Sequence, residues 1–245
     1  MKFSALLLLA TLAVLLWQLN AKPPAEAMSV AEAVRGVMAA EVTLGDIPLR
    51  EVVAAATGKT VLPFTPDKVP ADAACRTRIM QAADRVLAFL NAVDSPVRGL
   101  RRINEASRFV EDNLATLLTA GEFTCDYPRT SGGAQQRSGY PDLRIVHKPT
   151  GRVYFLDPKL YESGSVQSTL RTFYYEPKDL TGKIHEDACH LLLGISHDGK
   201  DGAWQFTGWR LLDLHDFRVR LKAEFQASNK DLYRKELTIG ESTER

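Results

Sequence analysis

The spacing of hydrophobic residues changes near residue 120, from a period typical of helices to one typical of strands. Up to about residue 120, apolar side chains recur every three or four positions, which is the spacing of helices that bury one face. Capping residues and prolines precede these stretches, and glycines or a Ser-Pro pair follow them. The predicted helices cover 29–40, 46–58, 71–92 and 98–120, and the stretch 60–70, which holds three prolines, is a predicted connector.

Beyond residue 120 the hydrophobic period becomes that of β-strands. Short apolar runs bounded by turn residues predict strands, and a strongly apolar run such as 190–195 is typical of a strand buried inside a sheet. The predicted strands are 123–127, 143–147, 153–161, 190–195 and 204–214, with a Gly/Ser/Gln-rich loop at 131–139 and helices at 165–173 and 219–233. This order of elements predicts an α/β domain.

The amino terminus has the pattern of a secretory signal peptide. Lys2 precedes an apolar run over 5–17, which is followed by two prolines and the small-residue pattern 25–27. A membrane anchor is the alternative, but the run is shorter than the ~20 residues that span a bilayer. We therefore expect residues 1–27 to be removed and the protein to be periplasmic or secreted, without a stable membrane partner.

The remaining chain is predicted to hold two regions. Residues 28–95 form an N-terminal helical region, and residues 96–245 form the domain that contains the strands. The N-terminal helices are compatible with a dimerisation unit, which would make the protein a homodimer, or with a recognition unit. Nothing in their sequence chooses between these two roles.

Composition and charge set weak bounds on the partner. With 45% hydrophobic and 25% charged side chains, the 245-residue chain is an ordinary globular protein. Loss of residues 1–27 removes two lysines and one glutamate from 31 basic and 30 acidic side chains, so the mature formal charge is zero. No global positive field therefore indicates a polyanionic partner. Between 125 and 185, however, nine basic residues face six acidic ones, which favours phosphate once a metal neutralises some carboxylates.

The three cysteines are Cys75, Cys125 and Cys189. An odd number in a chain that enters an oxidising compartment is compatible with one disulfide and one free thiol, or with three buried thiols. Their spacing matches no zinc motif. The five histidines also lack the spacing of a helical zinc site, and we interpret them as structural or surface groups.

The central chemical feature is a predicted hairpin. If 150–151 form its two-residue loop, Asp142 pairs with Lys159 and Arg144 pairs with Asp157. A shift of the strand register by one residue would change these pairs but would still leave Asp142 close to Asp157 and Lys159. Two carboxylates and one ammonium group are therefore expected to meet at one end of a sheet.

This constellation suits a hard divalent cation and a phosphodiester. Asp157 and Lys159 lie two residues apart, so they share one face of a strand while Pro158 points away. Two carboxylates in contact repel each other unless a cation lies between them, and Mg²⁺ prefers oxygen ligands. Such a cation would bridge the scissile phosphate and acidify water. Lys159 would orient or deprotonate the attacking water, or stabilise the pentavalent phosphorus.

Context selects this acid-x-Lys triplet from others in the chain. The segments 176–178 and 198–200 also have an acidic residue two positions before a lysine. The copy at Asp157 differs because it follows the apolar run 153–156 and lies fifteen residues after the pair Pro141-Asp142.

With these residues and the helix-strand order around them, the stretch from about 98 to 214 resembles the PD-(D/E)xK, or restriction-endonuclease-like, nuclease superfamily. The resemblance implies a mixed central sheet flanked by helices. It also implies Mg²⁺ or Mn²⁺ as cofactor, with Asp142 and Asp157 as metal ligands, and phosphodiester hydrolysis in nucleic acid, probably DNA.

The resemblance also suggests a third acidic residue on the helix before the first strand. Glu111 is the candidate for this metal-binding and catalytic position, and Glu105 on the same helix is the alternative; both also suit solvated helix surfaces. Pro158 departs from the family pattern, because it removes a ladder hydrogen bond. The strand must therefore be irregular or lie at an edge there.

Candidate substrate contacts follow Lys159. They are Gln167, Arg171, Tyr175 and Lys183, which lie where the next helix would return toward the site. Arg171 is suited to bidentate phosphate binding, and Gln167 resembles a frequent polar position of the family. The alternative for each is a solvated helix side chain or, for the tyrosine, a core residue.

The sequence thus favours an exported, metal-dependent endonuclease. One alternative is a non-catalytic, nuclease-like binding protein of the cell envelope, favoured by the neutral mature charge and Pro158. Another is a hydrolase of a different phosphodiester that uses the same metal centre.

Overall fold

The computed structural model describes residues 28–240. The predicted signal peptide lies outside the described residues, so export stays a prediction. Among residues 28–240, no helix combines the length and the apolar character needed to cross a bilayer.

The chain forms two compact units, one of which holds the sheet. The larger unit is Asp46–Val219, and the described part of the smaller unit consists of residues 28–45 together with 220–240. Helices α3 (Leu49–Thr57) and α4 (Pro70–Asn91) of the predicted region 28–95 therefore belong to the same unit as the strands. In the smaller unit, α2 (Val30–Thr43) begins at Ser29, whose side chain accepts a hydrogen bond from the Glu32 amide, as the sequence predicted.

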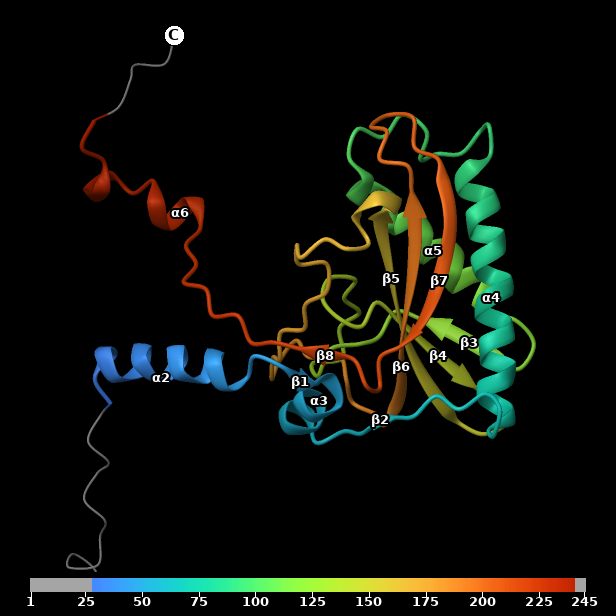
Figure 1. Cartoon of the computed structure of the whole chain (residues 1–245), viewed down its shortest axis with the longest axis horizontal. Coiled ribbons are helices and arrows are strands. Elements are labelled where there is room, and N and C mark those ends of the chain that lie inside the picture. Colours follow the sequence, from blue (N-terminus) through green and yellow to red (C-terminus); the bar gives the residue numbers. More distant parts are fainter. Residues whose placement is uncertain (1–27, 241–245) are drawn as a thin grey trace, which may run out of the picture. The chain divides into compact units, whose positions relative to one another are not determined.

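The larger unit is built around a six-stranded mixed sheet (Figure 1). The strand order is β2-β6-β5-β4-β3, and β7 also pairs with β6. β6 runs parallel to β2 and β5, whereas the β3–β4, β4–β5 and β6–β7 pairs are antiparallel. The strands are β2 (Val61–Leu62), β3 (Phe123–Asp126), β4 (Leu143–His147), β5 (Arg152–Glu162), β6 (Ala188–His197) and β7 (Phe206–Asp213). The expected mixed sheet flanked by helices is confirmed.

Two helices cover one face of this sheet (Figure 1). α4 (Pro70–Asn91) starts with a proline, which suits the first helical position, and buries a stripe at helical spacing that includes Ile79, Val86 and Leu90. α5 (Ser107–Leu118) buries Val110, Leu114 and Leu118 in the same way. These side chains pack on Tyr154, Leu156 and Leu193 from the strands and form the main core.

A smaller cluster lies on the opposite face of the sheet. Phe155 and Val153 of β5 pack there with Tyr140, Ile184 and Leu49, the first residue of α3 (Leu49–Thr57). Because side chains alternate along a strand, Asp157 and Lys159 belong to this second face. Strands β1 (Ile47–Pro48) and β8 (Arg218–Val219) form a separate two-stranded sheet.

Several predicted elements differ from the structure. The predicted helix 98–120 is shorter, because a 3-10 turn (Ile103–Ala106) precedes α5. The predicted connector 60–70 contributes β2, which pairs with β6.

Two further helix predictions are wrong. In place of the predicted helix 165–173 there is only a 3-10 turn, Ser163–Ser165, followed by irregular chain. Val166 and Leu170 are exposed, and Phe173 at the end of the segment packs on the second cluster, so the segment buries too little apolar surface to hold a helix. The predicted helix 219–233 is reduced to the single turn α6 (Asn229–Leu232), which a 3-10 turn (Lys235–Leu237) follows.

Candidate active site

The β4–β5 hairpin brings the two predicted aspartates together by a different register from the one predicted. His147 pairs with Arg152 and Leu143 pairs with Leu156, so the loop spans four residues, 148–151, rather than two. Gly151 ends this loop with a positive φ of 68°, a conformation that favours glycine. Continued by one residue, the ladder sets Asp142 opposite Asp157 rather than Lys159. The predicted pairing is wrong, whereas the predicted neighbourhood is confirmed.

Pro158 lies where β5 becomes an edge. The pairing with β4 ends at Leu156, whereas the pairing with β6 continues to Glu162. From Asp157 onward, no strand among residues 28–240 pairs with β5 on the β4 side. The edge position expected for Pro158 is confirmed, and it is where the acidic and basic side chains gather.

Lys159 joins the two aspartates. Its Nζ lies 2.6 Å from Oδ2 of Asp157 and 3.4 Å from Oδ2 of Asp142. The exposed fraction of the side chain is 33% for Lys159, 13% for Asp142 and 1% for Asp157. Solvent exposure therefore decreases through the site, from the Lys159 ammonium group at its surface to the Asp157 carboxylate at its base.

The Asp157 carboxylate is buried with few partners. Apart from the ion pair with Lys159, neither of its oxygens has a hydrogen-bond partner among the described residues. Burial first, and then the neighbouring Asp142 carboxylate, raise the pKa of Asp157 to about 7. Lys159 is therefore the cation that compensates this buried carboxylate, and it is shared with Asp142.

The pKa values of two lysines shift in opposite directions in the electrostatic field of these carboxylates. Burial opposes the charge on Lys159, but Asp157 and Asp142 outweigh it and raise its pKa. Lys183 is 3% exposed, and its Nζ donates to the carbonyl oxygen of Gln136 at 3.2 Å. Burial lowers the pKa of Lys183, although the carboxylates of the site partly oppose this effect. The predicted substrate residue Lys183 thus lies within the electrostatic reach of the site.

Glu111 lies near the site but is held by an arginine. Oε2 of Glu111 accepts from Nη2 of Arg137 at 3.0 Å, and the same guanidinium lies 3.0 Å from Asp112. Burial raises the pKa of Glu111, and Asp142 adds to this effect. Glu111 is therefore close enough to interact with Asp142, while Arg137 occupies its oxygen. The alternative, Glu105, is exposed in the 3-10 turn before α5.

The other predicted substrate residues are placed less directly. Gln167 and Arg171 are exposed on the irregular chain after β5, where the Arg171 guanidinium lies 5.4 Å from the centre of the Tyr174 ring. Tyr175 is half-buried and packs edge-on against Tyr140, with ring centroids 5.8 Å apart. Of the four, Lys183 is the one whose pKa the carboxylates of the site influence.

Two residues of this region escaped the sequence interpretation. Tyr140 is buried beside the site, where its hydroxyl bonds to Nδ1 of His190 at 2.7 Å, and burial followed by Asp157 raises its pKa well above the ordinary value. Arg137 lies in the predicted Gly/Ser/Gln-rich loop, five residues before Asp142. The only sequence signal for either was closeness to the Pro141-Asp142 pair.

The donor set suits a cation that keeps water ligands. No group of three or more His, Cys, Asp or Glu side chains within residues 28–240 is arranged to hold a metal ion. Mg²⁺, however, commonly takes one or two carboxylates and completes its shell with water and phosphate oxygens. Asp142 and Asp157 supply two carboxylates, and Oδ1 of Asp157, which has no partner among the described residues, is an oxygen that such a cation would bind.

The cysteines take no part in this site. Cys75, Cys125 and Cys189 are free thiols, so of the two alternatives the structure has three thiols and no disulfide among them. Burial raises the pKa of each thiol.

Comparison with known proteins points to one group of enzymes. A family model described as the type II restriction enzyme MjaV family matches residues 44–236, a range that includes every charged side chain of the site. The chain is also 34% identical over 147 residues to the type II restriction enzyme MjaV of Methanocaldococcus jannaschii. This match covers 58% of the chain and 64% of the relative, so it spans less than two thirds of the relative's length.

Proposed function

Because the chain belongs to the type II restriction enzyme MjaV family, we propose that it is an endonuclease that hydrolyses phosphodiester bonds in DNA with a divalent cation, Mg²⁺ or Mn²⁺. The observation that carries this proposal is the buried, under-bonded carboxylate of Asp157 beside Asp142 and Lys159. The name of the relative supports DNA as the substrate.

In this proposal Asp142 and Asp157 hold the cation. When bound, Mg²⁺ neutralises charge on the phosphate and makes water more acidic. The two carboxylates are adjacent, and burial weakens the competing solvation by water, so a cation stabilises both of them at once. The arrangement also supports membership of the PD-(D/E)xK superfamily, with Asp142, Asp157 and Lys159 in its motif.

The two lysines have different tasks. Since Asp157 and Asp142 raise its pKa, Lys159 is a cation at neutral pH and is suited to stabilise the negative charge that develops on phosphorus. Lys183 is more deeply buried and has a lowered pKa, so it loses its proton more readily. We assign Lys183 to orientation of the attacking water or of a non-bridging phosphate oxygen.

Glu111 completes the acidic set at a greater distance. Its carboxylate interacts with Asp142 and is bonded to Arg137. We propose that Glu111 orients water ligands of the cation, and that Arg137 fixes the position of this glutamate.

The test is cleavage of supercoiled plasmid DNA over a titration of Mg²⁺. We expect nicked and linear products with the wild-type chain, and a loss of at least ~10³-fold in rate with Asp157→Asn, because both cation binding and charge stabilisation fail. Asp94→Asn is the matched control, since this aspartate is exposed near the end of α4. We expect it to cleave at the wild-type rate.

Two further substrates define the chemical class. Single-stranded nucleic acid and a small chromogenic phosphodiester are offered under the same conditions, and duplex DNA is expected to be cleaved fastest. Hydrolysis of the small diester without cleavage of DNA would make the protein a different phosphodiesterase. A folded wild-type protein that leaves all three substrates intact with Mg²⁺ and with Mn²⁺ would refute the proposal.

A further inference from the structure

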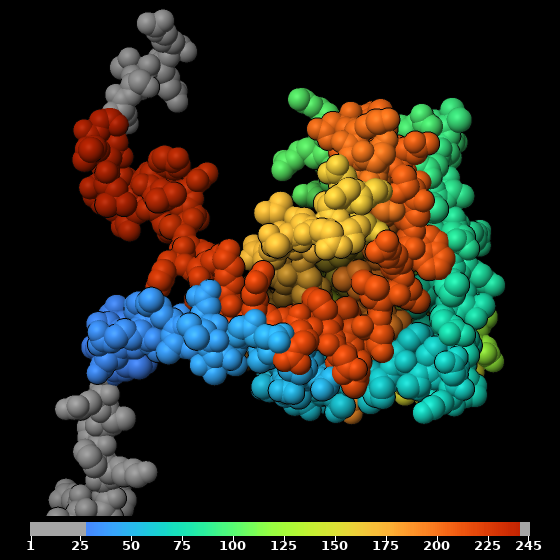
Figure 2. Space-filling view, in the orientation of Figure 1, coloured from blue at the N-terminus to red at the C-terminus, as the bar shows by residue number. Residues whose placement is uncertain are grey.

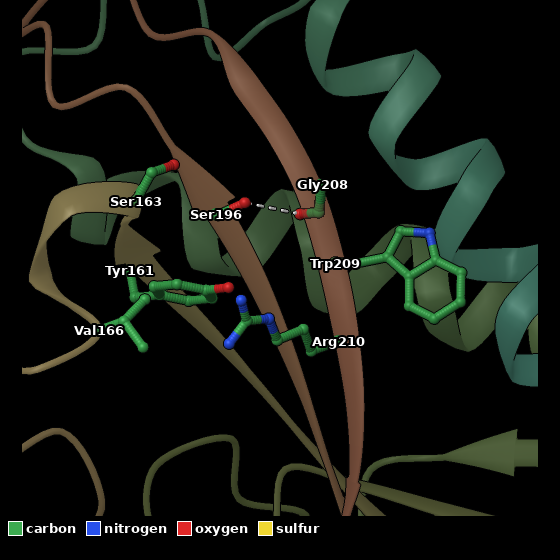
Figure 3. A pocket seen from close by; sticks show the side chains of 7 residues that line it. All are labelled: Tyr161, Ser163, Val166, Ser196, Gly208, Trp209 and Arg210. Carbon is green, nitrogen blue, oxygen red and sulfur yellow. Dashed lines mark hydrogen bonds between the residues drawn. The ribbon is translucent and has the colours of Figure 1, made fainter.

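A pocket of about 270 Å³ lies on the same face of the sheet as the candidate active site (Figure 3). Residues 157, 159 and 161 alternate onto this face of β5, so Tyr161 follows Lys159 in the same row. The side chains around the opening come from three strands and the turn after β5. They are Tyr161, Ser163, Val166, Ser196 and Arg210.

The strand register relates this pocket directly to Lys159. Lys159 pairs with Gly194 of β6, and Gly194 pairs with Arg210 of β7, so the three residues form one row across three strands. Neighbouring strands lie ~4.8 Å apart, which puts the Cα atoms of Lys159 and Arg210 roughly 10 Å apart. Gly194 carries no side chain, and a Cβ there would lie 3.1 Å from the Tyr161 ring. The aromatic ring therefore lies over the glycine, between the two basic residues.

Two polar groups of the pocket have no partner in the described part of the chain. Neither the hydroxyl of Tyr161 nor the guanidinium of Arg210 makes a hydrogen bond or ion pair with residues 28–240. In Figure 3 these two groups point toward one another, whereas Trp209 points the other way, where its Nε1 donates to Asp84 of α4 at 2.8 Å. The pocket thus presents donors without acceptors of their own.

The remaining hydroxyl groups form the wall of the pocket. Ser163 and Ser196 both bond to the hydroxyl of Thr207, at 2.9 and 2.8 Å, and Ser196 also donates to the carbonyl of Gly208 (Figure 3). These bonds tie the turn after β5 to β6 and β7. No carboxylate lines the pocket, so nothing in it repels an anion.

The pocket is open to solvent beside irregular chain. Figure 2 shows the gold segment that follows β5 on the surface beside the orange of β7, and Val166 of that segment lines the same pocket as Arg210. An exposed guanidinium presents five donors in a fork that matches the oxygens of a phosphate. A charged, planar donor group with a neighbouring phenol suits a phosphodiester better than an apolar ligand.

We propose that Tyr161 and Arg210 bind a backbone phosphate of the DNA strand that is cut, one to three nucleotides from the scissile bond. The proposal rests on the proposed endonuclease function. The ~10 Å between Lys159 and Arg210 is roughly three times the ~3.4 Å that each nucleotide of one strand advances along the axis, which sets the upper limit of this range. This contact fixes the position of the strand on the enzyme and takes no part in the chemical step.

The experiment measures binding of a labelled DNA duplex to the full chain over a series of KCl concentrations. Asp157→Asn serves as the parent, because it does not cleave. We expect Arg210→Ala to weaken binding ~5–10-fold and to reduce the slope of log K against log[salt] by ~0.9, the change for one lost phosphate contact. Arg210→Lys should keep the slope and recover part of the affinity, because a point charge replaces the fork.

Arg85→Ala is the matched control. Arg85 is an exposed arginine of α4, which covers the other face of the sheet, and its loss should leave both affinity and slope unchanged. An equal change in both variants would mean that only net charge matters, and would overturn the assignment. So would an Arg210→Ala variant that binds with the parent slope.

Cleavage by otherwise wild-type protein separates this proposal from the function on which it rests. We expect Arg210→Ala and Tyr161→Phe to raise KM while kcat stays within ~3-fold, because uniform binding is lost. If the wild type cleaves DNA and both variants have an unchanged KM, the proposed phosphate contact is refuted and the proposed endonuclease function stands. A wild-type protein that neither binds nor cuts DNA would refute both the phosphate contact and the endonuclease function.

Discussion

Strand β5 takes part in two ion pairs with a buried aspartate, Arg152 with Asp72 of α4 and Lys159 with Asp157 of β5 itself. Asp72 pairs with Arg152 at the start of the strand, on the face covered by α4. Asp157 pairs with Lys159 near its end, on the other face. Both aspartates are buried, with exposed fractions of 0% and 1%. The difference between them lies in how their oxygens are satisfied.

Asp72 is saturated with donors. Its oxygens accept from Nε and Nη2 of Arg152 at 2.6 and 3.1 Å, from the Tyr154 hydroxyl at 2.9 Å and from the Thr65 amide at 2.8 Å. A buried charge with this many partners is a structural tie between helix, connector and strand. Asp157 has one lysine and a second carboxylate beside it. Burial therefore does not distinguish Asp72 from the proposed metal ligand Asp157, whereas the number of hydrogen-bond donors does.

We expect the largest effect on cleavage when Lys159, the basic partner of Asp157, is removed. We expect Lys159→Met to lower kcat for DNA cleavage by ~10³-fold, because it removes a positive charge from the developing phosphorane. Metal affinity should stay near the wild-type value, and stability should fall less than in Arg152→Met, because Asp157, whose pKa is already raised, takes up a proton when it loses Lys159. Single-turnover cleavage and a Mn²⁺ titration measure the two effects. A parallel loss of metal binding would contradict the role given to Lys159.

Removal of the basic partner on the structural side should act on stability instead. Arg152→Met leaves the Asp72 carboxylate buried without its main partner, so we expect the free energy of unfolding to fall by roughly 3–5 kcal/mol. Denaturant unfolding of both methionine variants measures the change. Turnover per folded molecule should remain at the wild-type value. Equal destabilisation by Lys159→Met would erase the contrast between the two pairs.

The pH dependence of stability should reveal the under-bonded carboxylate. Because the pKa of Asp157 is raised in the folded protein, protonated Asp157 stabilises the fold at low pH. This stability is lost as the pH rises from about 4 through about 7. Without metal at pH 8, we expect Asp157→Asn to melt higher than wild type, by on the order of 5 °C. The two should converge near pH 4.

Added Mg²⁺ supplies the control for the pH experiment. The cation should raise the melting temperature of the wild type at pH 8 and leave that of Asp157→Asn unchanged, since ligands stabilise only the state that binds them. A wild-type curve that is flat with pH, or equal responses to Mg²⁺, would show that Asp157 is already satisfied.

The smallest effect is expected at Glu111, which Arg137 already neutralises in part. We expect Glu111→Gln to lower the cleavage rate ~10-fold and to raise the Mg²⁺ concentration required for half-maximal rate, because one acidic group beside Asp142 is lost. Glu105→Gln is the matched control on the turn before α5. A loss as large as that of Asp157→Asn would make Glu111 a direct metal ligand.

The sequence predicted the parts of the fold that bury apolar faces. α4 and the strands β4 to β7 follow from apolar spacing, because each packs on the sheet or lies within it. The predicted helix 165–173 failed for the complementary reason. Its apolar residues have helical spacing, but serine, threonine and valine favour other backbone conformations and no surface receives the helix. Spacing alone does not make a helix without a partner.

The candidate site was predictable in composition but not in geometry. Asp142, Asp157 and Lys159 gather as expected, although the turn length, and with it the register, was misjudged. No local pattern indicated that Arg137 would hold Glu111, or that Lys183 would be buried near the carboxylates. Each places a loop residue near a helix or strand that is distant in sequence, and such long-range arrangements leave no periodic signal.

The free edge of β5 bears on how copies of this protein meet. An unpaired run of strand is a template for strand addition by a second chain, and native proteins oppose it with prolines and inward-facing charges. Here Pro158 lies between the buried Asp157 and Lys159, at the point where the edge begins. Asp157 and Lys159, which we propose act in cleavage, therefore also hinder aggregation through this edge, together with Pro158. We therefore expect any self-association to use another surface and to leave this edge to the nucleic acid.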